Sequence, residues 1–360
     1  MFQFFESRID PYPEEQPAEP PKGLLAFCWL YTKPVAGWIA VMTCLTAFVA
    51  IGEVALFGFL GSIVDWLSNA ERVGFLEREG PLLWSMGAFL LVALPLAVLA
   101  HSLIVHQTLL GNYPMIARWQ MHRYLLRQSM TFFADEFAGR VATRVMQTSL
   151  AVREVVMKVA DVLVYMLVYF FSVLVMVATS DLRLAVPLLI WLVIYVTVVS
   201  YFVPKLAVVS RKQADARSMM TGRIVDSYTN INTVKLFSHA GREANYAKNG
   251  MQRFLQTVHR QMRLVTTMAF CVYFNNVLVV FLIAGLSIWL WLDSVVSVGS
   301  IAVAVALALR LNGMSQWIMW EMSGLFESIG VVHDGMAMLA KRQAVFDLSL
   351  IHISEPTRRH

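Results

Sequence analysis

The sequence predicts an all-α membrane protein with six transmembrane helices and long cytoplasmic helical extensions. Hydrophobic residues make up 58% of the 360-residue chain, and its mean hydropathy is +0.61. Charged residues make up 15%, against about 25% in soluble globular domains. The apolar residues also gather into runs long enough to cross a bilayer, which excludes an ordinary water-soluble domain.

Each predicted span is an apolar run of about 20 or more residues, the length that crosses the hydrocarbon core. A shorter apolar segment at 23–33 predicts an elbow helix that lies along the membrane surface before the first span. Residues 1–21 are polar and proline-rich, which predicts a disordered cytoplasmic N-terminal tail. The six spans are predicted near 36–62, 82–111, 159–179, 182–203, 268–292 and 299–320.

The distribution of Lys and Arg orients the chain in the membrane. Seven lie in the connection 112–158 and eleven in the connection 205–263, whereas the three short loops on the other side hold Arg72, Arg78 and Arg183. Basic loops stay cytoplasmic, so both long connections and both termini are predicted to lie inside. The net charge of +5 therefore reflects membrane topology, and no nucleic-acid partner is expected.

The two long connections carry mixed charges at helical spacing with little Pro or Gly, over 115–155 and 205–263. We therefore expect spans 2 to 5 to continue as helices beyond the bilayer. A helix of ~40 residues is about 60 Å long, while the hydrocarbon core is about 30 Å thick. The extensions would reach roughly 25–30 Å into the cytoplasm, each pair joined at its tip by a short turn or cross-helix.

The first predicted tip combines two aromatic residues, an acidic pair, and a Gly-Arg step. Phe132 and Phe133 would supply anchoring area for a short helix that docks into a partner. Gly139 would permit the break before the next long helix. An ordinary interhelical turn with aromatics at the membrane edge explains the same residues, and the residues alone leave both interpretations open.

The second predicted tip spans 227–237, where Ser, Thr and Asn cluster as they do where helices start and stop. Tyr228 combines an apolar ring with a polar end, which suits a docking surface.

Together, these features resemble the transmembrane domain of ABC exporters. The first tip resembles the FF…GR…R pattern of that family's first coupling helix, and residues 230–237 with Glu243 resemble the I-x-T-V-K-x-F…E pattern of the second. Both patterns fall in the correct gaps between spans, and the resemblance assigns 22–347 to one such domain, with its elbow helix at 23–33.

The resemblance implies that each coupling helix docks into a nucleotide-binding domain, whose ATP-driven closure moves the spans. It implies a domain-swapped dimer with a second transmembrane subunit, identical or different, in a bacterial inner membrane. A small amphipathic or hydrophobic molecule would be the substrate. The first coupling helix would comprise Phe132, Phe133, Asp135, Glu136, Phe137, Gly139 and Arg140, and the second Tyr228, Thr229, Asn230 and Ile231.

No G-x-x-x-x-G-K-[ST] phosphate loop occurs in the sequence, so no catalytic or metal-binding residues are expected in this chain. ATP and Mg²⁺ would act through a nucleotide-binding domain on a longer gene product or a separate polypeptide. Residues 348–360 resemble a translated sequencing adapter, and we expect the native reading frame to continue past Asp347.

Ionisable and polar residues inside spans are candidates for function, because burying them in lipid is costly. His101 and His106 are five residues apart, a poor match for one helical face. A hydrogen bond to a neighbouring helix or a position near a lumen explains them better than a haem or metal pair. Glu53 and Arg310 could form a buried pair or face a water-filled cavity. The candidate substrate cavity comprises Glu53, Asn275, Asn276, Arg310, Asn312, Gln316, Trp317, Trp320 and Glu321.

The stripe from Arg310 to Glu321 suits two interpretations, a cavity wall or packing across a subunit interface. Pro95 and Pro187 are expected to kink their spans.

Two other classes of function are weighed against the exporter. A secondary transporter or channel not driven by ATP would favour inverted repeats or broken helices at mid-membrane, and neither is clear in the sequence. A membrane-embedded enzyme would need a convergent cluster of catalytic side chains at one depth, which the sequence does not indicate.

Overall fold

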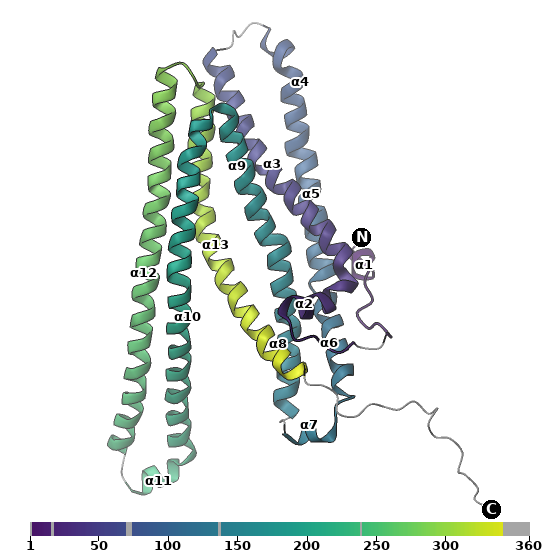
Figure 1. The fold of residues 1–360 in the computed structure, drawn as a ribbon, viewed down its shortest axis with the longest axis vertical. Coiled ribbons are helices and arrows are strands. Elements are labelled where there is room, and N and C mark those ends of the chain that lie inside the picture. Colours follow the sequence, from purple (N-terminus) through teal and green to yellow (C-terminus); the bar gives the residue numbers. More distant parts are fainter. Residues whose placement is uncertain (1, 16–17, 70–73, 136–137, 238–239, 341–360) are drawn as a thin grey trace, which may run out of the picture. The chain divides into compact units, whose positions relative to one another are not determined.

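The computed structural model describes residues 2–15, 18–69, 74–135, 138–237 and 240–340, and the regular secondary structure in these ranges is helical (Figure 1). The elements are α1 (Phe2–Glu6), α2 (Leu24–Thr32), η1 (Lys33–Val35), α3 (Ala36–Asn69), α4 (Phe75–Ala88), η2 (Phe89–Ala93), α5 (Leu94–Leu103), η3 (Ile104–Leu109), α6 (Asn112–Leu125), α7 (Met130–Asp135), α8 (Ala138–Met157), η4 (Lys158–Leu163), α9 (Val164–Ser180), η5 (Leu182–Leu184), α10 (Ala185–Thr229), α11 (Ile231–Leu236), α12 (Ala240–Leu292) and α13 (Val298–Leu339).

Six helical stretches in the described ranges are long and apolar enough to cross a membrane. Each contains one of the predicted spans, which confirms the six-span all-α fold. The stretches are Leu24–Ser68, Phe75–Leu125, Gly139–Ser180, Leu182–Thr229, Gly241–Leu292 and Val298–Leu339.

The helices of spans 4 and 5 are far longer than a bilayer requires. Helix α10 has 45 residues and α12 has 53, which at 1.5 Å per residue gives roughly 65–80 Å. A hydrocarbon core of about 30 Å accounts for less than half of each. The long extensions predicted for this pair are therefore present as continuous helix.

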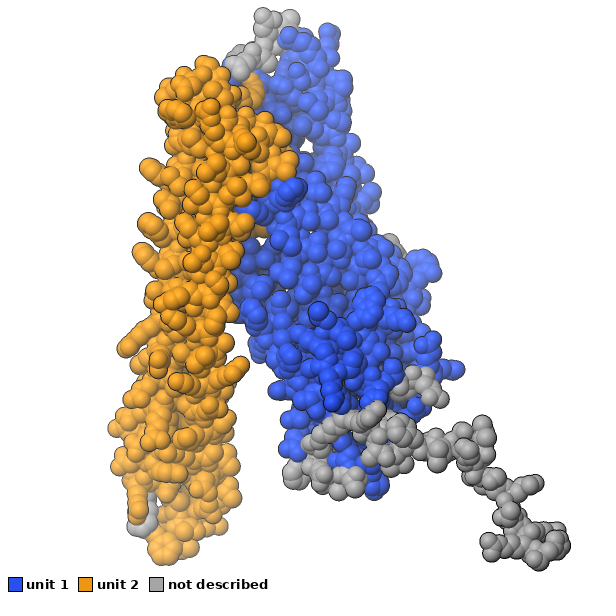
Figure 2. Space-filling view, in the orientation of Figure 1, with its two compact units in different colours: residues 1–62, 66–173, 316–360 blue, residues 63–65, 174–315 orange. Residues whose placement is uncertain are grey.

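The chain divides into two compact units, coloured separately in Figure 2. Unit 1 contains Met1–Ser62, Trp66–Val173 and Gln316–His360, of which the described parts include α2, both helices around α7 and the second half of α13. Unit 2 contains Ile63–Asp65 and Leu174–Ser315, dominated by the antiparallel pair α10 and α12.

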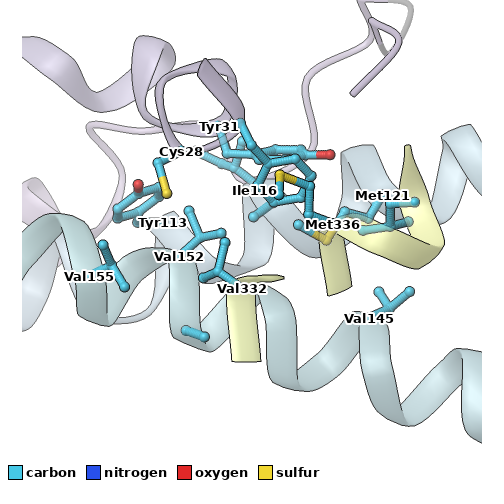
Figure 3. Close-up of a cluster of buried hydrophobic side chains, with 14 of the residues drawn as sticks. Cys28, Tyr31, Tyr113, Ile116, Met121, Val145, Val152, Val155, Val332 and Met336 are labelled. Carbon is cyan, nitrogen blue, oxygen red and sulfur yellow. The ribbon is translucent and has the colours of Figure 1, made fainter. Parts of the chain in front are cut away.

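The core of unit 1 joins α2 to α6, α8 and the end of α13, as the close-up in Figure 3 shows. Tyr31 of α2, Tyr113 of α6 and Val332 of α13 are each at most 2% exposed. The hydroxyls of Thr32 and Tyr113 lie 2.6 Å apart, so these two buried hydroxyls satisfy each other. The expected helix at 23–33 is thus anchored to the extension of span 2.

Two glycines let α13 approach its neighbours closely in unit 1. A methyl group on Gly335 would overlap the side chain of Thr148 on α8. A methyl group on Gly324 would lie 2.6 Å from Nζ of Lys158. At Gly335 the α13 backbone lies directly against the buried Thr148 side chain, so a residue without a Cβ is required there, whereas the Lys158 ammonium group is the end of a flexible side chain that can shift.

The N-terminal segment differs from the disordered tail that its composition predicts. Residues 2–15 follow one face of the span 2 helix, which supplies the donors Thr108, Asn112, Trp119 and Arg123 to backbone carbonyl oxygens of the segment at 2.9–3.2 Å. Ile9 is buried in the unit 1 core. These contacts satisfy peptide carbonyls and cover apolar surface, which offsets the entropy that a proline-rich segment loses on ordering.

The prolines act differently from one another. Pro95 is the second residue of α5, just after the π-helical turn η2, which accommodates a residue that cannot donate an N–H. Pro187 lies in the first turn of α10, where the missing N–H has no intrahelical partner to lose. The kink expected at Pro187 therefore has no cause there. Pro204, in the interior of α10, is the position that breaks the hydrogen-bond ladder.

Candidate coupling helices and intramembrane polar sites

Helix α7 closes the hairpin between α6 and α8 and holds the first predicted coupling residues. Phe132 is 7% exposed and belongs to the unit 1 core, whereas Phe133 is 38% exposed. Their rings meet edge to face, with centroids 5.2 Å apart. The pair therefore has two roles: Phe132 fixes α7 to the core, and Phe133 is presented outward.

The other residues predicted for the first coupling helix fall in three groups. Asp135 is the last residue of α7. Glu136 and Phe137 lie outside the described residues. Gly139 and Arg140 are exposed in the first turn of α8, which begins at Ala138, so Gly139 lies within the helix.

An apolar groove of about 320 Å³ lies beside α7, between α6 and α8. Phe133 and Tyr12, from the N-terminal segment, both line it. The Tyr12 ring packs edge to face on Trp119 at 5.7 Å. The N-terminal segment thus contributes directly to the surroundings of α7, a contact that the sequence did not indicate.

Helix α11 closes the hairpin between α10 and α12 at the second predicted tip. Asn230 caps the end of α10. Its side-chain amide donates to the backbone and side-chain oxygens of Asp226 at 3.1 and 3.0 Å. The Ser227 hydroxyl donates to the Glu243 carboxylate at 2.8 Å, which joins α10 to α12 one turn before the tip. These short-range bonds define the break that the cluster of Ser, Thr and Asn predicts.

The second tip presents a row of side chains outward. Tyr228 is 71% exposed and Ile231 is 40% exposed, and Thr229 and Asn230 are also exposed. Leu236 follows at 80% exposed. Apolar side chains at the end of a polar helical hairpin are typical of a surface that contacts another molecule.

Three of the predicted cavity residues form a buried network in unit 2 instead of an open wall. The side-chain amide of Asn276 donates to Oδ1 of Asn312 at 3.1 Å and to Oγ of Ser315 at 2.6 Å. The indole N–H of Trp191 donates to Oδ1 of Asn276 at 2.8 Å, and Asn275 donates to the Trp191 carbonyl at 3.1 Å. Asn275 and Asn276 are 3% and 1% exposed. In this conformation they clamp spans 4, 5 and 6 together.

A ladder of polar pairs follows one face of span 3 in unit 1. Lys158 binds Glu321 of α13 at 2.9 Å, and the hydroxyl of Tyr165 donates to Glu53 of α3 at 2.7 Å. Positions 158, 161 and 165 recur at helical spacing, so each rung joins span 3 to another helix of the unit. Two of the predicted cavity residues, Glu53 and Glu321, are therefore held by partners within unit 1.

The middle rung is built around Asp161, in the π-helical turn η4. Its Oδ1 lies 3.1 Å from Nε2 of His101 and accepts a hydrogen bond from Thr46 of α3. His101 thus bonds to neighbouring helices as expected, while His106 bonds to Ser102 of its own helix. Asp161 is not among the residues predicted from the sequence, and its partners His101 and Thr46 lie on other helices far along the chain.

The remaining predicted cavity residues are exposed on α13. Arg310 belongs to unit 2, and Gln316, Trp317 and Trp320 belong to unit 1. Trp320 is 79% exposed, and the Trp317 ring meets the ring of Tyr165 at right angles at 5.9 Å. The Glu53–Arg310 pair stays a prediction.

Six apolar helices and two closed helical hairpins define a multi-pass α-helical membrane protein. Residues 39–314 match the family model of the ABC transporter transmembrane region. The chain therefore belongs to the ABC transporter family as a membrane component. The matched residues include both α7 and α11.

A curated relative supports the same family. The "Uncharacterized ABC transporter ATP-binding protein" of Haemophilus influenzae (strain ATCC 51907 / DSM 11121 / KW20 / Rd) is 46% identical over 348 residues. The alignment covers 96% of this chain and 56% of the relative. The chain thus spans little more than half the length of that relative.

Proposed function

We propose that the chain is the membrane-spanning part of an ATP-driven exporter that moves an amphipathic or hydrophobic molecule out of the cytoplasm or between leaflets. Its coupling surfaces are α7 and α11, which dock on nucleotide-binding domains. The observation that carries this proposal is the exposure of apolar side chains at both hairpin tips, Met130 at 84% and Leu236 at 80% among them.

Lipid does not account for the exposed tips. Thr229 ends α10 twenty-six residues beyond position 203, where span 4 is predicted to end. At 1.5 Å per residue this is roughly 39 Å of helix, far beyond the headgroup layer. A protein partner at the tip is therefore the occupant that removes Tyr228 and Leu236 from water.

The nucleotide-binding domain is the partner that membership of the ABC transporter family implies. The Haemophilus influenzae relative is named as an ATP-binding protein, and it is longer than this chain. In our proposal ATP and Mg²⁺ bind that domain, either fused downstream or as a separate polypeptide. Two membrane subunits pair in a bacterial inner membrane with both termini cytoplasmic, as the basic connections favour.

Side chains on α13 support an amphipathic or hydrophobic substrate. Trp317 and Trp320 expose indole rings, and the Glu53–Tyr165 pair provides polar atoms within the same unit. Aromatic surface with a few polar groups is typical of sites for such molecules.

The test compares tip variants of the chain reconstituted in liposomes with its nucleotide-binding domain. Phe133→Ala and Tyr228→Ala together are expected to lower ATP-driven uptake of a fluorescent amphipathic dye at least tenfold, as loss of anchoring aromatics does at protein interfaces. Leu150→Ala and Leu255→Ala together are the matched control. These leucines lie on the shafts of the hairpins, α8 and α12, and are 38% and 49% exposed.

Two outcomes oppose the proposal. Equal transport by the tip and shaft variants would remove the coupling role of α7 and α11. Dye movement that follows an ion gradient without ATP would instead establish a secondary transporter.

A further inference from the structure

The base of the α10–α12 hairpin carries six exposed basic or imidazole side chains, here called the basic belt. Three lie on α10 and three on α12, all within unit 2. The belt comprises Lys205, Arg211, Lys212, His259, Arg260 and Arg263.

The two halves of the belt lie at one level along the hairpin. Gln261 of α12 donates to the Ser210 hydroxyl of α10 at 3.2 Å, which fixes the register of the two helices. Because the helices are antiparallel, Arg211 is then level with Arg260. The five cationic side chains and His259 therefore lie within one band along the hairpin.

This band has no acidic counterpart nearby. The sequence holds no Asp or Glu in 204–214 or 254–267, whereas the distal half of the hairpin has Asp215, Asp226 and Glu243. Among the described residues, none of the belt side chains has a carboxylate ion pair within 4.0 Å. The ammonium group of Lys205 lies instead 3.5 Å from the centroid of the Tyr201 ring. The positive charge is thus uncompensated within the unit.

The belt lies at the depth of the lipid headgroups. It starts two residues after the predicted end of span 4 at 203, and its last member on α12 lies five residues before span 5 begins at 268. These offsets place its members roughly 3–14 Å beyond the hydrocarbon core. Tyr201, which is 57% exposed, borders the belt as aromatic residues do at membrane interfaces.

A shallow hollow of about 530 Å³ marks one face of α12 within the belt. It is lined by His259, Met262, Arg263, Thr266 and Thr267. The Thr267 hydroxyl already donates to the Arg263 carbonyl at 2.8 Å. Arg263, His259 and Thr266 supply N–H and O–H groups to the hollow, and such a donor set suits the oxygens of a phosphate group.

We propose that the basic belt binds the phosphates of anionic phospholipids in the cytoplasmic leaflet, with one phosphodiester in the hollow on α12. Anionic lipids are the phosphate source found at this depth, and basic residues beside a membrane attract them. Lipid binding would fix the height of the α10–α12 hairpin at the membrane surface. This proposal is independent of ATP coupling and of the transported substrate.

The test counts lipids bound to the purified chain by native mass spectrometry, using phosphatidylglycerol and phosphatidylcholine. Arg260→Gln with Arg263→Gln removes two belt charges. Lys248→Gln with Arg253→Gln removes two exposed charges farther along α12 and is the matched control. Circular dichroism verifies that both variants keep their helix content.

The belt variant is expected to bind phosphatidylglycerol at least tenfold more weakly, since each basic residue near a membrane contributes about fivefold. Its binding of phosphatidylcholine and the control variant's binding of phosphatidylglycerol are expected to change less than twofold. Equal losses in both variants, or no loss in either, would overturn the proposal. So would equally tight binding of soluble glycerol phosphate, or a change in oligomer mass without a change in lipid count.

Discussion

The indole N–H of Trp191 donates to the side-chain oxygen of Asn276 over 2.8 Å, and this bond ties α10 to α12 inside unit 2. The side-chain amide of Asn276 in turn donates hydrogen bonds to Asn312 and Ser315 of α13. Each of these atoms would otherwise be an unsatisfied polar group in an apolar surrounding. The network therefore makes spans 4, 5 and 6 of the unit a single packed element.

Replacing Asn276 with Leu tests this clamp. The variant keeps similar volume but leaves the Trp191 N–H and the Asn312 oxygen without their partner. We expect the free energy of unfolding in mixed micelles to fall by about 1–3 kcal/mol, the cost of unsatisfied buried polar groups. Asn249→Leu, on the exposed part of the same helix, is the control and should change stability little. Equal stability of the Asn276 variant and the unaltered chain would show that the network contributes nothing.

The N-terminal segment depends on Arg123, whose Nη1 binds the carbonyl oxygens of Pro13, Glu14 and Glu15 at 2.9–3.0 Å. Arg123→Gln should release this end of the segment, because a neutral amide cannot reach three carbonyls at once. Hydrogen exchange of amides in residues 5–15 should then rise about tenfold, which corresponds to ~1.4 kcal/mol.

Arg144→Gln, the same substitution on α8, is the control for the N-terminal segment and should leave exchange in residues 5–15 unchanged. If Arg123→Gln also left it unchanged, the carbonyl contacts would not be what orders the segment.

Close approach of α13 to α8 makes Gly335 intolerant of a side chain. In Gly335→Ala the new methyl would overlap Thr148, so the helices must shift apart. Overpacking of this kind costs about 1–3 kcal/mol, measured as a lower midpoint of thermal unfolding. Gly330→Ala has open space around its Cβ and should be neutral or slightly stabilising. Similar midpoints for the two variants would refute the close approach.

The spans and both hairpin tips could be predicted because local sequence decides them. Twenty apolar residues in a row define a span whatever surrounds it, and the Ser, Thr and Asn around Asn230 end a helix by bonding to their own backbone. Phe132 and Phe133 were predicted as a pair at the first tip. The sequence could not show that one faces the core and the other faces outward, because that depends on how α7 packs.

Contacts distant in sequence explain what was missed. The donors that order the N-terminal segment lie 103–110 residues away along the chain. The sequence shows Asn275 and Asn276 as polar residues within a span. Their burial depends on Trp191 of another helix, whose indole N–H donates to Asn276. Likewise, the role of Asp161 in joining helices follows only from its contacts with His101 and Thr46, which the fold brings beside it.

Contact between each hairpin tip and a nucleotide-binding domain is the central claim, and site-specific photo-crosslinking measures it directly. A photoreactive phenylalanine analogue would replace Phe133 or Tyr228 in the assembled transporter, with Leu150 and Leu255 replaced as shaft controls. We expect crosslinks to the nucleotide-binding domain from both tips and from neither control position. Absence of crosslinks from both tips in a transporter that still performs ATP-driven transport would contradict docking by α7 and α11.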